Sequence, residues 1–213
     1  MFDGPPDLSL ETGLWGAGID YIAGIDEVGR GALAGPVAAA ALILPRDESL
    51  LERLRGVRDS KQLTPRERSK WAPRLRKAAV SWGVGFSSHF EIDLLGIVAA
   101  TRLAMQRAID SLQIPPEHLL IDYLLLPDVD LPQTALVHGD SRSLSIAAAS
   151  ILAKTARDAL LLALDAEFPG YGFGAHKGYC TPGHVSALEQ LGPCPVHRKS
   201  FAPIRDQGIG NGG

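Results

Sequence analysis

The sequence predicts an α/β protein in which a mixed five-stranded sheet is flanked by helices and followed by a helical C-terminal extension. Two apolar runs, residues 20–28 and 34–45, are joined by a short glycine-rich link, which is typical of an antiparallel hairpin. Residues 118–126 form a near-continuous apolar run, as in a strand buried on both faces. Strand-like and helix-like segments then follow one another along the chain, which favours a sheet covered by helices.

Three further segments complete the expected sheet. Residues 79–88 alternate loosely and follow the hairpin as a third strand. The apolar run at 118–126 is the fourth strand and holds one acid, Asp122. A short fifth strand is expected over 134–138 and ends just before Asp140.

Helices are predicted by capping signals and by the spacing of apolar residues. Residues 64–67, Thr-Pro-Arg-Glu, are a capping box with proline at the first helical position, so a helix begins there. Residues 93–112 carry an apolar stripe at helical spacing, and the Ala- and Leu-rich segment 143–168 is the strongest helical pattern. Shorter helices are expected over 48–56 and 181–191, the second after a glycine- and aromatic-rich loop over 170–178.

The size and composition are those of a globular protein with a substantial core. The chain has 213 residues, of which 46% are hydrophobic and 21% are charged. We therefore expect one domain with a small appendage. Residues 1–19 are expected to form a flexible leader, and residues 206–213 a flexible tail.

Charge, cysteine content and hydropathy narrow the functional classes. The net charge of −3 decides little about nucleic-acid binding, because acids at a metal site can offset a basic groove. Cys180 and Cys194 form neither a disulfide framework nor a zinc-ligand pattern, which fits a reducing cytoplasm. No apolar segment is long enough to span a membrane, and the N-terminus lacks the pattern of a signal peptide. We expect a cytoplasmic monomer with no membrane partner.

Four acids lie at the ends of, or inside, the predicted strands: Asp26, Glu27, Asp122 and Asp140. Each has an ordinary alternative. Asp140 could cap a helix, Asp122 could pair with a buried arginine, and Asp26 and Glu27 could be a solvated strand end. Together they indicate one site, because a lone carboxylate in a buried strand costs several kcal/mol or more unless it is paired or metal-bound.

Such a carboxylate set suits hard divalent cations, which take oxygen ligands. Two metal ions about 4 Å apart can clamp the attacking and leaving oxygens of a phosphodiester displacement. The adjacent Gly29-Arg30-Gly31 triplet allows close backbone approach and phosphate binding, so phosphodiester chemistry is favoured over a dinucleotide fingerprint, whose glycine spacing differs. Asp158 lies roughly 20 Å along the long helix from Asp140 and is expected to pair with Lys154 instead.

Several segments resemble, in order, those of type 2 ribonuclease H, the bacterial ribonuclease HII. Residues 24–37 read GIDEVGRGALAGPV and look like the opening signature of that family. Residues 59–63, DSKQL, resemble its DSKKL segment, and residues 139–154 are close to its most specific block. Residues 171–179 and 197–205 complete a match that covers about residues 20–205.

The resemblance implies a ribonuclease H-like catalytic domain over 20–168 and a loop–helix extension over 169–205 that completes the substrate site. It implies Mg²⁺- or Mn²⁺-dependent hydrolysis of RNA in RNA–DNA hybrids, and incision 5′ of ribonucleotides embedded in duplex DNA, leaving a 3′-hydroxyl and a 5′-phosphate. It further implies a role in removing ribonucleotides from DNA. The family's metal ligands correspond to the same four acids. Its 2′-hydroxyl-reading triplet and junction-sensing tyrosine correspond to Gly29, Arg30, Gly31 and Tyr179.

Other basic residues are candidates for gripping the substrate backbone. Lys61 and Lys177 lie inside matched motifs and are expected to contact it, whereas for Arg142 a contact and a solvated surface role are equally favoured. Two positions depart from the family pattern: Tyr123 follows the third acid where glycine is usual, and Cys180 replaces a usual glycine after Tyr179. Two alternative functions are a non-catalytic hybrid-binding module and the related ribonuclease HIII, which typically carries a long N-terminal domain.

Overall fold

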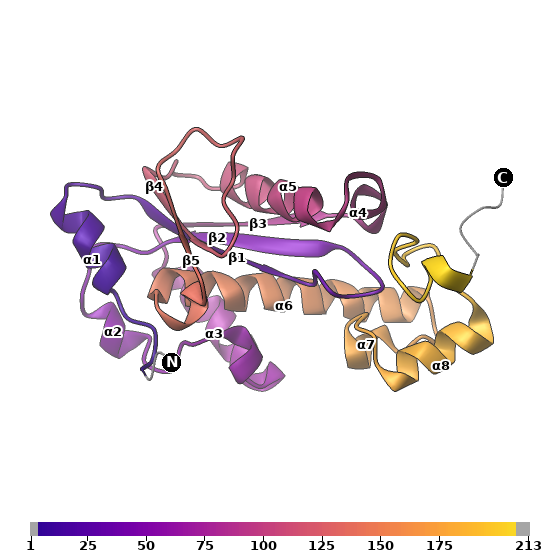
Figure 1. Cartoon of the computed structure of the whole chain (residues 1–213). Coiled ribbons are helices and arrows are strands. Elements are labelled where there is room, and N and C mark those ends of the chain that lie inside the picture. The colour runs from indigo at the N-terminus through magenta and orange to yellow at the C-terminus, as the bar shows by residue number, and fades with distance from the viewer. Residues whose placement is uncertain (1–3, 208–213) are drawn as a thin grey trace.

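The computed structural model describes residues 4–207, and they form a five-stranded mixed sheet covered by helices (Figure 1). The strand order is β3-β2-β1-β4-β5. β1 pairs antiparallel with β2, and β2 with β3, whereas β1, β4 and β5 run parallel to one another. The strands β1 to β5 are, in this order, Ile22–Val28, Val37–Ile43, Ser81–Ser87, His118–Asp122 and Gln133–Leu136.

The helices form a layer on each face of the sheet, as Figure 1 shows. The long helix α6 (Leu144–Glu167) and α3 (Pro65–Ala78) cover one face, and α5 (Ile97–Asp110) covers the other. Strand residues alternate between the two faces, so Ile22 packs toward α6 and Ile25 toward α5. None of the helices within residues 4–207 combines the length and apolar content that crossing a bilayer requires.

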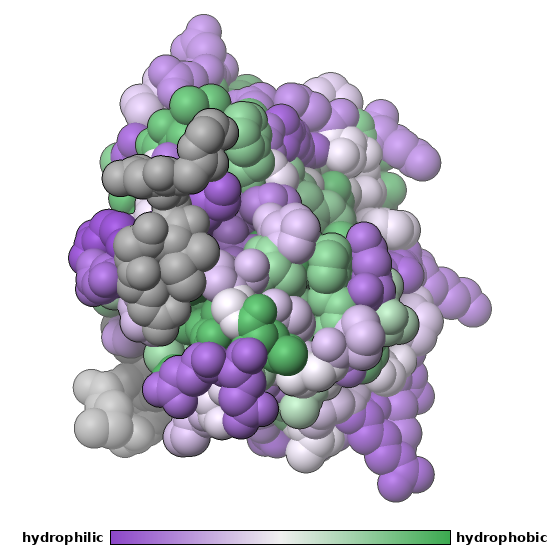
Figure 2. All heavy atoms as spheres, turned by 90° about the vertical axis from the view of Figure 1, so that its right-hand side faces the viewer, coloured by the Kyte–Doolittle hydropathy of each residue, from purple (hydrophilic) through white to green (hydrophobic). Residues whose placement is uncertain are grey.

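The C-terminal extension has an apolar core of its own around Phe173 and Leu188, which also takes in Leu161 from α6. It contains α7 (Phe173–His176) and α8 (Pro182–Leu191). Figure 2 views the molecule from the side of this extension, where hydrophobic residues gather toward the middle and hydrophilic ones project around the edge.

The predicted mixed sheet, the hairpin and the main helices are confirmed. Thr64 forms the expected capping box with Glu67 at the start of α3. The N-terminus of α8 lies at Pro182, with Thr181 as its cap. α6 spans nearly the whole segment predicted for it.

Several boundaries differ from the prediction. The single helix expected over 93–112 is two helices, α4 (His89–Leu95) and α5, because Gly96 has a left-handed φ of 79° that interrupts the helical backbone. The helix expected over 48–56 is only α2 (Leu50–Arg53). β4 ends at Asp122 rather than at residue 126, because Tyr123 has a φ of 64°. The loop expected over 170–178 contains the short helix α7.

The prediction of a flexible leader over 1–19 is wrong for much of its length. Ser9–Gly16 form helix α1, and Leu8 and Trp15 are buried against the main core. The buried carboxylate of Glu11 accepts hydrogen bonds from the hydroxyls of Ser143 and Ser145 and from the Ser145 N–H, at 2.6, 2.7 and 3.0 Å. The leader therefore bonds to the start of α6. Of the predicted tail, residues 208–213 lie outside the described residues.

β1 lies unusually close to α6 at Gly24. A Cβ atom there would overlap the backbone of Ser145, so only glycine allows the approach. This contact brings the strand that carries Asp26 and Glu27 against the N-terminal turn of the helix that follows Asp140.

We expect the Glu11→Ala variant to lower the free energy of unfolding by about 2–4 kcal/mol, because it leaves buried donors without an acceptor. Urea denaturation with circular dichroism measures the change. Glu48→Ala, at an exposed position, is the matched control and should change stability by less than about 0.5 kcal/mol. Equal stability of the two variants would contradict the proposed anchoring of α1.

Candidate active site

Three of the four predicted acids lie at the carboxyl ends of two neighbouring parallel strands. Asp26 and Glu27 are near the end of β1, and Asp122 is the last residue of β4. Ile25 pairs with Ile121, so Asp26 and Asp122 occupy the next position on adjacent strands. Open α/β sheets commonly bind ligands at this edge.

Asp140 reaches the same edge from the next strand. It lies in a 3₁₀ turn, Gly139–Ser141, that follows β5, and the Gly139 N–H donates a 2.7 Å hydrogen bond to Asp122 Oδ1. The alternative that Asp140 caps the long helix is wrong, because Ser143 is the N-cap and accepts from the Ile146 N–H. The structure thus brings the four acids to one end of the sheet.

Burial and mutual repulsion both act on these carboxylates. Asp26 is 4% exposed, and its pKa is raised well above the usual value by burial and then by the charges of Glu27 and Asp122. Burial also raises the pKa of Asp140, to about 6, with the charges of Asp59 and Asp122 adding to the shift. The pKa of Glu27 is raised by burial despite the opposing charge of Arg30.

The donor set fits a hard divalent cation. All the candidate ligands are carboxylate oxygens, and buried Glu27 Oε2 has no hydrogen-bond partner among the described residues, while Oε1 pairs with Arg30 at 3.2 Å. Within residues 4–207, no three acidic, histidine or cysteine side chains already surround one point as metal ligands do. The fit therefore rests on the chemistry of the site and its concentrated negative charge.

Two residues of the 59–63 segment also lie at this site. Asp59 lies near Asp140, where its charge raises the pKa of Asp140, and it caps a short turn, Ser60–Gln62, by accepting from the Lys61 N–H at 2.9 Å. Burial lowers the pKa of Lys61, but the charges of Asp59 and Asp26 outweigh burial, and the net pKa is raised. The Lys61 ammonium thus lies near the acids. Sequence reasoning did not single out Asp59, although its position two residues before Lys61 was a usable signal.

A fully buried arginine, Arg198, forms hydrogen bonds to the backbone of the Gly29-Arg30-Gly31 triplet. Arg198 donates to the carbonyls of Gly29, Arg30 and Gly35 at 2.7, 2.8 and 3.0 Å. Burial and then the charge of Arg157 lower the pKa of Arg198 to about 9. Gly29 has a φ of 91°, and a Cβ there would overlap the Arg157 side chain, so glycine is required.

A second buried arginine joins this loop to the C-terminal extension. Arg157, on α6, donates to the carbonyls of Pro36, Lys177 and Ala34 at 2.8, 2.9 and 3.2 Å. Neither Arg157 nor Arg198 was identified from the sequence. Arginine is rarely fully buried, so nothing in the sequence distinguishes these two from exposed arginines.

Tyr179 lies beside the triplet. Its backbone forms an antiparallel bridge with Ala32, one residue after Gly31, and the guanidinium of Arg157 lies 5.5 Å from the centre of its ring. The Lys154 ammonium is 5.8 Å from the same ring centre. Two cations near one aromatic ring favour a fixed ring position.

A chain of buried imidazoles holds the backbone of Tyr179, and its donors and acceptors fix one tautomer at each ring. The Cys194 N–H donates to His197 Nδ1 at 2.9 Å, so the His197 proton is on Nε2 and donates to His184 Nε2 at 3.0 Å. The His184 proton is then on Nδ1 and donates to the Tyr179 carbonyl at 3.0 Å. Burial lowers the pKa of His197 to about 4 and also lowers that of His184, in agreement with two neutral rings.

The other residues that the sequence analysis discussed, Lys177, Arg142 and Asp158, make hydrogen bonds or ion pairs to groups other than the four acids. The Lys177 ammonium donates to the Gly174 carbonyl, and Lys177 has a left-handed φ of 55°. Arg142 ends the turn that holds Asp140, and its carbonyl accepts from the Asp7 N–H. Asp158 pairs with Lys154 at 2.8 Å, as expected.

The two departures from the family pattern are both at exposed positions. Tyr123 is 62% exposed and has a backbone conformation that favours glycine, directly after Asp122. Cys180 is an exposed free thiol.

The family model described as Ribonuclease HII matches residues 23–204. The chain is 53% identical over 201 residues to a ribonuclease HII of Synechococcus sp. (strain JA-3-3Ab), covering 94% of this chain and 90% of that protein. It is 52% identical over 199 residues to a ribonuclease HII of Anaeromyxobacter sp. (strain Fw109-5). That match covers 93% of this chain and 62% of the relative's length.

Solved structures show the same fold. The ribonuclease H2 of Pyrococcus horikoshii OT3 superposes with a TM-score of 0.71 at 27% identity, covering 90% of this chain and all of that one. Bst-RNase HIII, solved in complex with Mn²⁺, shares the fold with a TM-score of 0.62 at 21% identity, covering 89% of this chain and 69% of its own length.

The raised pKa of Asp140 predicts a pH effect on stability in the presence of chelator. The folded carboxyl holds its proton up to about pH 6, whereas the unfolded one ionises near 3.8. The native state therefore binds more protons between these values, and stability falls as pH rises from 5 to 7. We expect Asp140→Asn to remove about 1 kcal/mol of this fall between pH 5 and pH 7.

Urea denaturation in chelator at pH 5, 6 and 7 measures this difference. Asp128→Asn, at an exposed position, is the control and should keep the slope of the unaltered protein. Added Mg²⁺ or Mn²⁺ should stabilise the unaltered protein at pH 7 more than Asp140→Asn. Parallel pH curves for all three proteins would show that the pKa of Asp140 is not raised in the folded protein.

Proposed function

The chain belongs to the ribonuclease HII family, and we propose that Asp26, Glu27, Asp122 and Asp140 carry out its reaction. It is an endoribonuclease that cleaves RNA in RNA–DNA hybrids and at ribonucleotides embedded in DNA. The observation that supports the site is the convergence of these carboxylates at the ends of neighbouring parallel strands, where burial and mutual repulsion raise the pKa values of Asp26 and Asp140.

The family depends on divalent metal, and we propose a two-ion site for Mg²⁺ or Mn²⁺ held by the four acids. Bound ions would polarise the scissile phosphate and make a water more acidic. Water oxygen attacks phosphorus, and the bond from phosphorus to the 3′-oxygen breaks. The upstream strand keeps a 3′-hydroxyl, and the ribonucleotide keeps the 5′-phosphate.

This chain's own residues orient the substrate around that bond. The Lys61 ammonium lies near the acids and is suited to contact a phosphate oxygen. Asp59 lies next to Asp140 and raises its pKa, so it acts on the charge and orientation of Asp140. We assign Lys61 a substrate contact and Asp59 a positioning role.

Selection of the ribonucleotide falls to the triplet and Tyr179. Arg198 fixes the carbonyls of Gly29 and Arg30 from the interior, so the backbone of the triplet is presented in one conformation. A rigid backbone can read a 2′-hydroxyl, the group that distinguishes RNA from DNA. We propose that the ring of Tyr179 packs against the next deoxyribose, where an additional hydroxyl would not fit.

The wider assignments follow from the substrate. We propose that the protein takes RNA–DNA hybrids and ribonucleotide-containing duplex DNA, acts in ribonucleotide removal, and works as a monomer. A cytoplasmic location is supported by the DNA substrate and by the two free thiols, Cys180 and Cys194. The C-terminal extension completes the substrate site through Tyr179.

The alternative is a non-catalytic hybrid-binding module. Retention of all four acids favours the enzyme. A duplex with one embedded ribonucleotide, incubated with Mg²⁺, with Mn²⁺ and with chelator, separates the two, because only the enzyme gives metal-dependent incision. The same duplex also separates ribonuclease HIII, which does not cut single ribonucleotides.

Asp26→Asn should reduce incision to background while preserving the fold, because one buried ligand oxygen becomes an amide and the site loses a charge. Gel analysis of a labelled single-ribonucleotide duplex measures incision, and circular dichroism measures folding. Asp110→Asn, an exposed position on α5, is the control and should retain full activity. Metal-dependent incision by Asp26→Asn at the unaltered rate would refute the assignment.

Tyr179→Ala should reduce the preference for a single embedded ribonucleotide over a continuous RNA–DNA hybrid by about tenfold or more, since a stacking contact contributes about 1–3 kcal/mol. The ratio of kcat/KM on the two substrates measures the preference. Tyr21→Ala, an exposed tyrosine away from the site, is the matched control. If both substrates lose activity in parallel with thermal stability, Tyr179 is a packing residue.

A further inference from the structure

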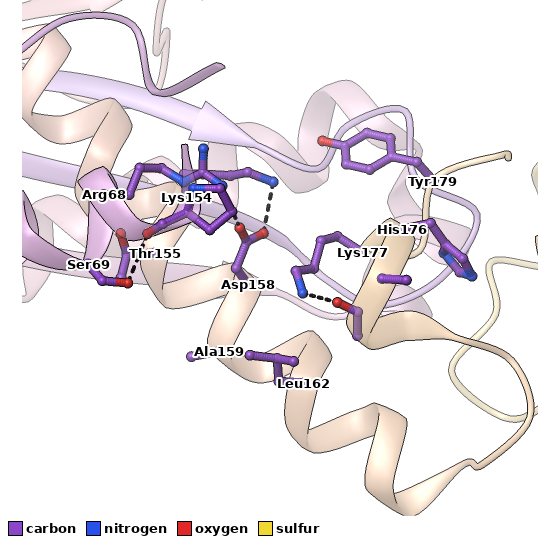
Figure 3. A pocket seen from close by; sticks show the side chains of 13 residues that line it. Arg68, Ser69, Lys154, Thr155, Asp158, Ala159, Leu162, His176, Lys177 and Tyr179 are labelled. Carbon is purple, nitrogen blue, oxygen red and sulfur yellow. Dashed lines mark hydrogen bonds and ion pairs between the residues drawn. The ribbon is translucent and has the colours of Figure 1, made fainter. Parts of the chain in front are cut away.

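A groove of about 510 Å³ lies between α3, α6 and the segment around α7, with Tyr179 in its lining (Figure 3). Its walls are mainly polar or small. The charged and aromatic groups that line it are Arg68 from α3, Lys154 and Asp158 from α6, and Lys177 and Tyr179 from the extension.

Positive charge exceeds negative charge in this groove. Asp158 Oδ1 pairs with Lys154 at 2.8 Å and Oδ2 pairs with Arg68 at 3.3 Å, so one carboxylate is shared by two cations. Figure 3 shows both cationic groups turned toward Asp158, with Lys177 on the opposite wall. Three cationic side chains against one acid leave a net charge that suits an anion.

The cationic groups are fixed in place. Asp158 and the Tyr179 ring hold the Lys154 ammonium from two directions, and its side chain is 14% exposed. Arg68 also donates to the carbonyls of Ser60 and Leu63. The buried Thr155 hydroxyl, in the same wall, has no partner among the described residues. Ordered cations beside an unused hydroxyl are features of a binding site more than of a solvated surface.

The position of the groove indicates the kind of anion. Tyr179 is bridged to Ala32 beside the triplet on one side and lines the groove on the other. A strand whose ribonucleotide lies at the triplet and whose next sugar lies on Tyr179 then enters the groove with its following phosphate.

We propose that this groove binds the second phosphodiester on the 3′ side of the embedded ribonucleotide, with the Lys154 ammonium as its contact and Asp158 as the residue that positions it. The proposal rests on the proposed function, because it places the strand by the junction. It assigns the groove to the DNA part of the substrate, downstream of the cleaved bond.

A neutral methylphosphonate tests the contact one linkage at a time. It is placed at the first, second or third linkage 3′ of the ribonucleotide, and kcat/KM is measured for the unaltered protein, Lys154→Gln and Lys154→Arg. At the second linkage the unaltered protein and Lys154→Arg should lose about tenfold, the size of one charged hydrogen bond. Lys154→Gln should lose the same factor on unmodified DNA and nothing further on the second-linkage duplex.

Two further measurements test the contact between Lys154 and the second phosphodiester. Lys77→Gln, an exposed charge change on α3 outside the groove, should keep the full sensitivity to methylphosphonate. Lys154→Gln should also show a shallower dependence of kcat/KM on salt, by nearly one unit of logarithmic slope. Thermal melting confirms folding, and Lys177→Gln provides a second groove variant if Lys154→Gln does not fold.

Results that contradict the groove proposal differ from results that contradict the proposed function. If the losses from Lys154→Gln and from the second-linkage methylphosphonate multiply, the two groups do not touch and the groove proposal is wrong. If sensitivity moves to the first or third linkage, the groove holds a different part of the strand. A failure of the proposed function looks different, because unmodified duplex would then not be incised by any of the proteins.

Discussion

The constraint on which the rest of this structure depends is the burial of like charges at one edge of the sheet. Asp26 is almost inaccessible and lies beside Glu27 in sequence and beside Asp122 across the sheet. Burial and repulsion act in the same direction on Asp26 and Glu27, as their raised pKa values show. An arrangement that costs stability persists only where the surrounding structure enforces it. The close approach of Gly24 to α6 and the bonding of Glu11 to the start of α6 supply that enforcement.

Two buried arginines hold the loop that follows β1 in place. Arg157 and Arg198 make their hydrogen bonds to backbone carbonyls of the triplet, the following turn and the C-terminal extension. These contacts join parts of the chain that are far apart in sequence. The imidazole chain through His197 and His184 adds a third attachment, at the Tyr179 carbonyl. The triplet, Tyr179 and α6 are therefore joined by one network of buried hydrogen bonds.

Much of the fold and the acid set could be predicted because their signals are local. Apolar runs predicted the strands, and the capping box predicted the start of α3. Asp122 was conspicuous because it interrupts an apolar run. The rest depends on tertiary contacts. The amphipathic signal of α1 is weak, and its order comes from Glu11 bonding to residues more than 130 positions away. Arg157 and Arg198 have no local pattern that distinguishes them from solvated arginines. The end of β4 depends on one backbone angle, at Tyr123.

The two buried arginines have an electrostatic consequence beyond their hydrogen bonds. Among the described residues neither forms an ion pair with a carboxylate, so each keeps a largely uncompensated charge inside the protein. The total charge of −3 therefore hides a strongly uneven distribution, negative at the end of the sheet and positive beneath the loop. A polyanion approaching this molecule meets an oriented dipole, which can align the duplex before contact is made.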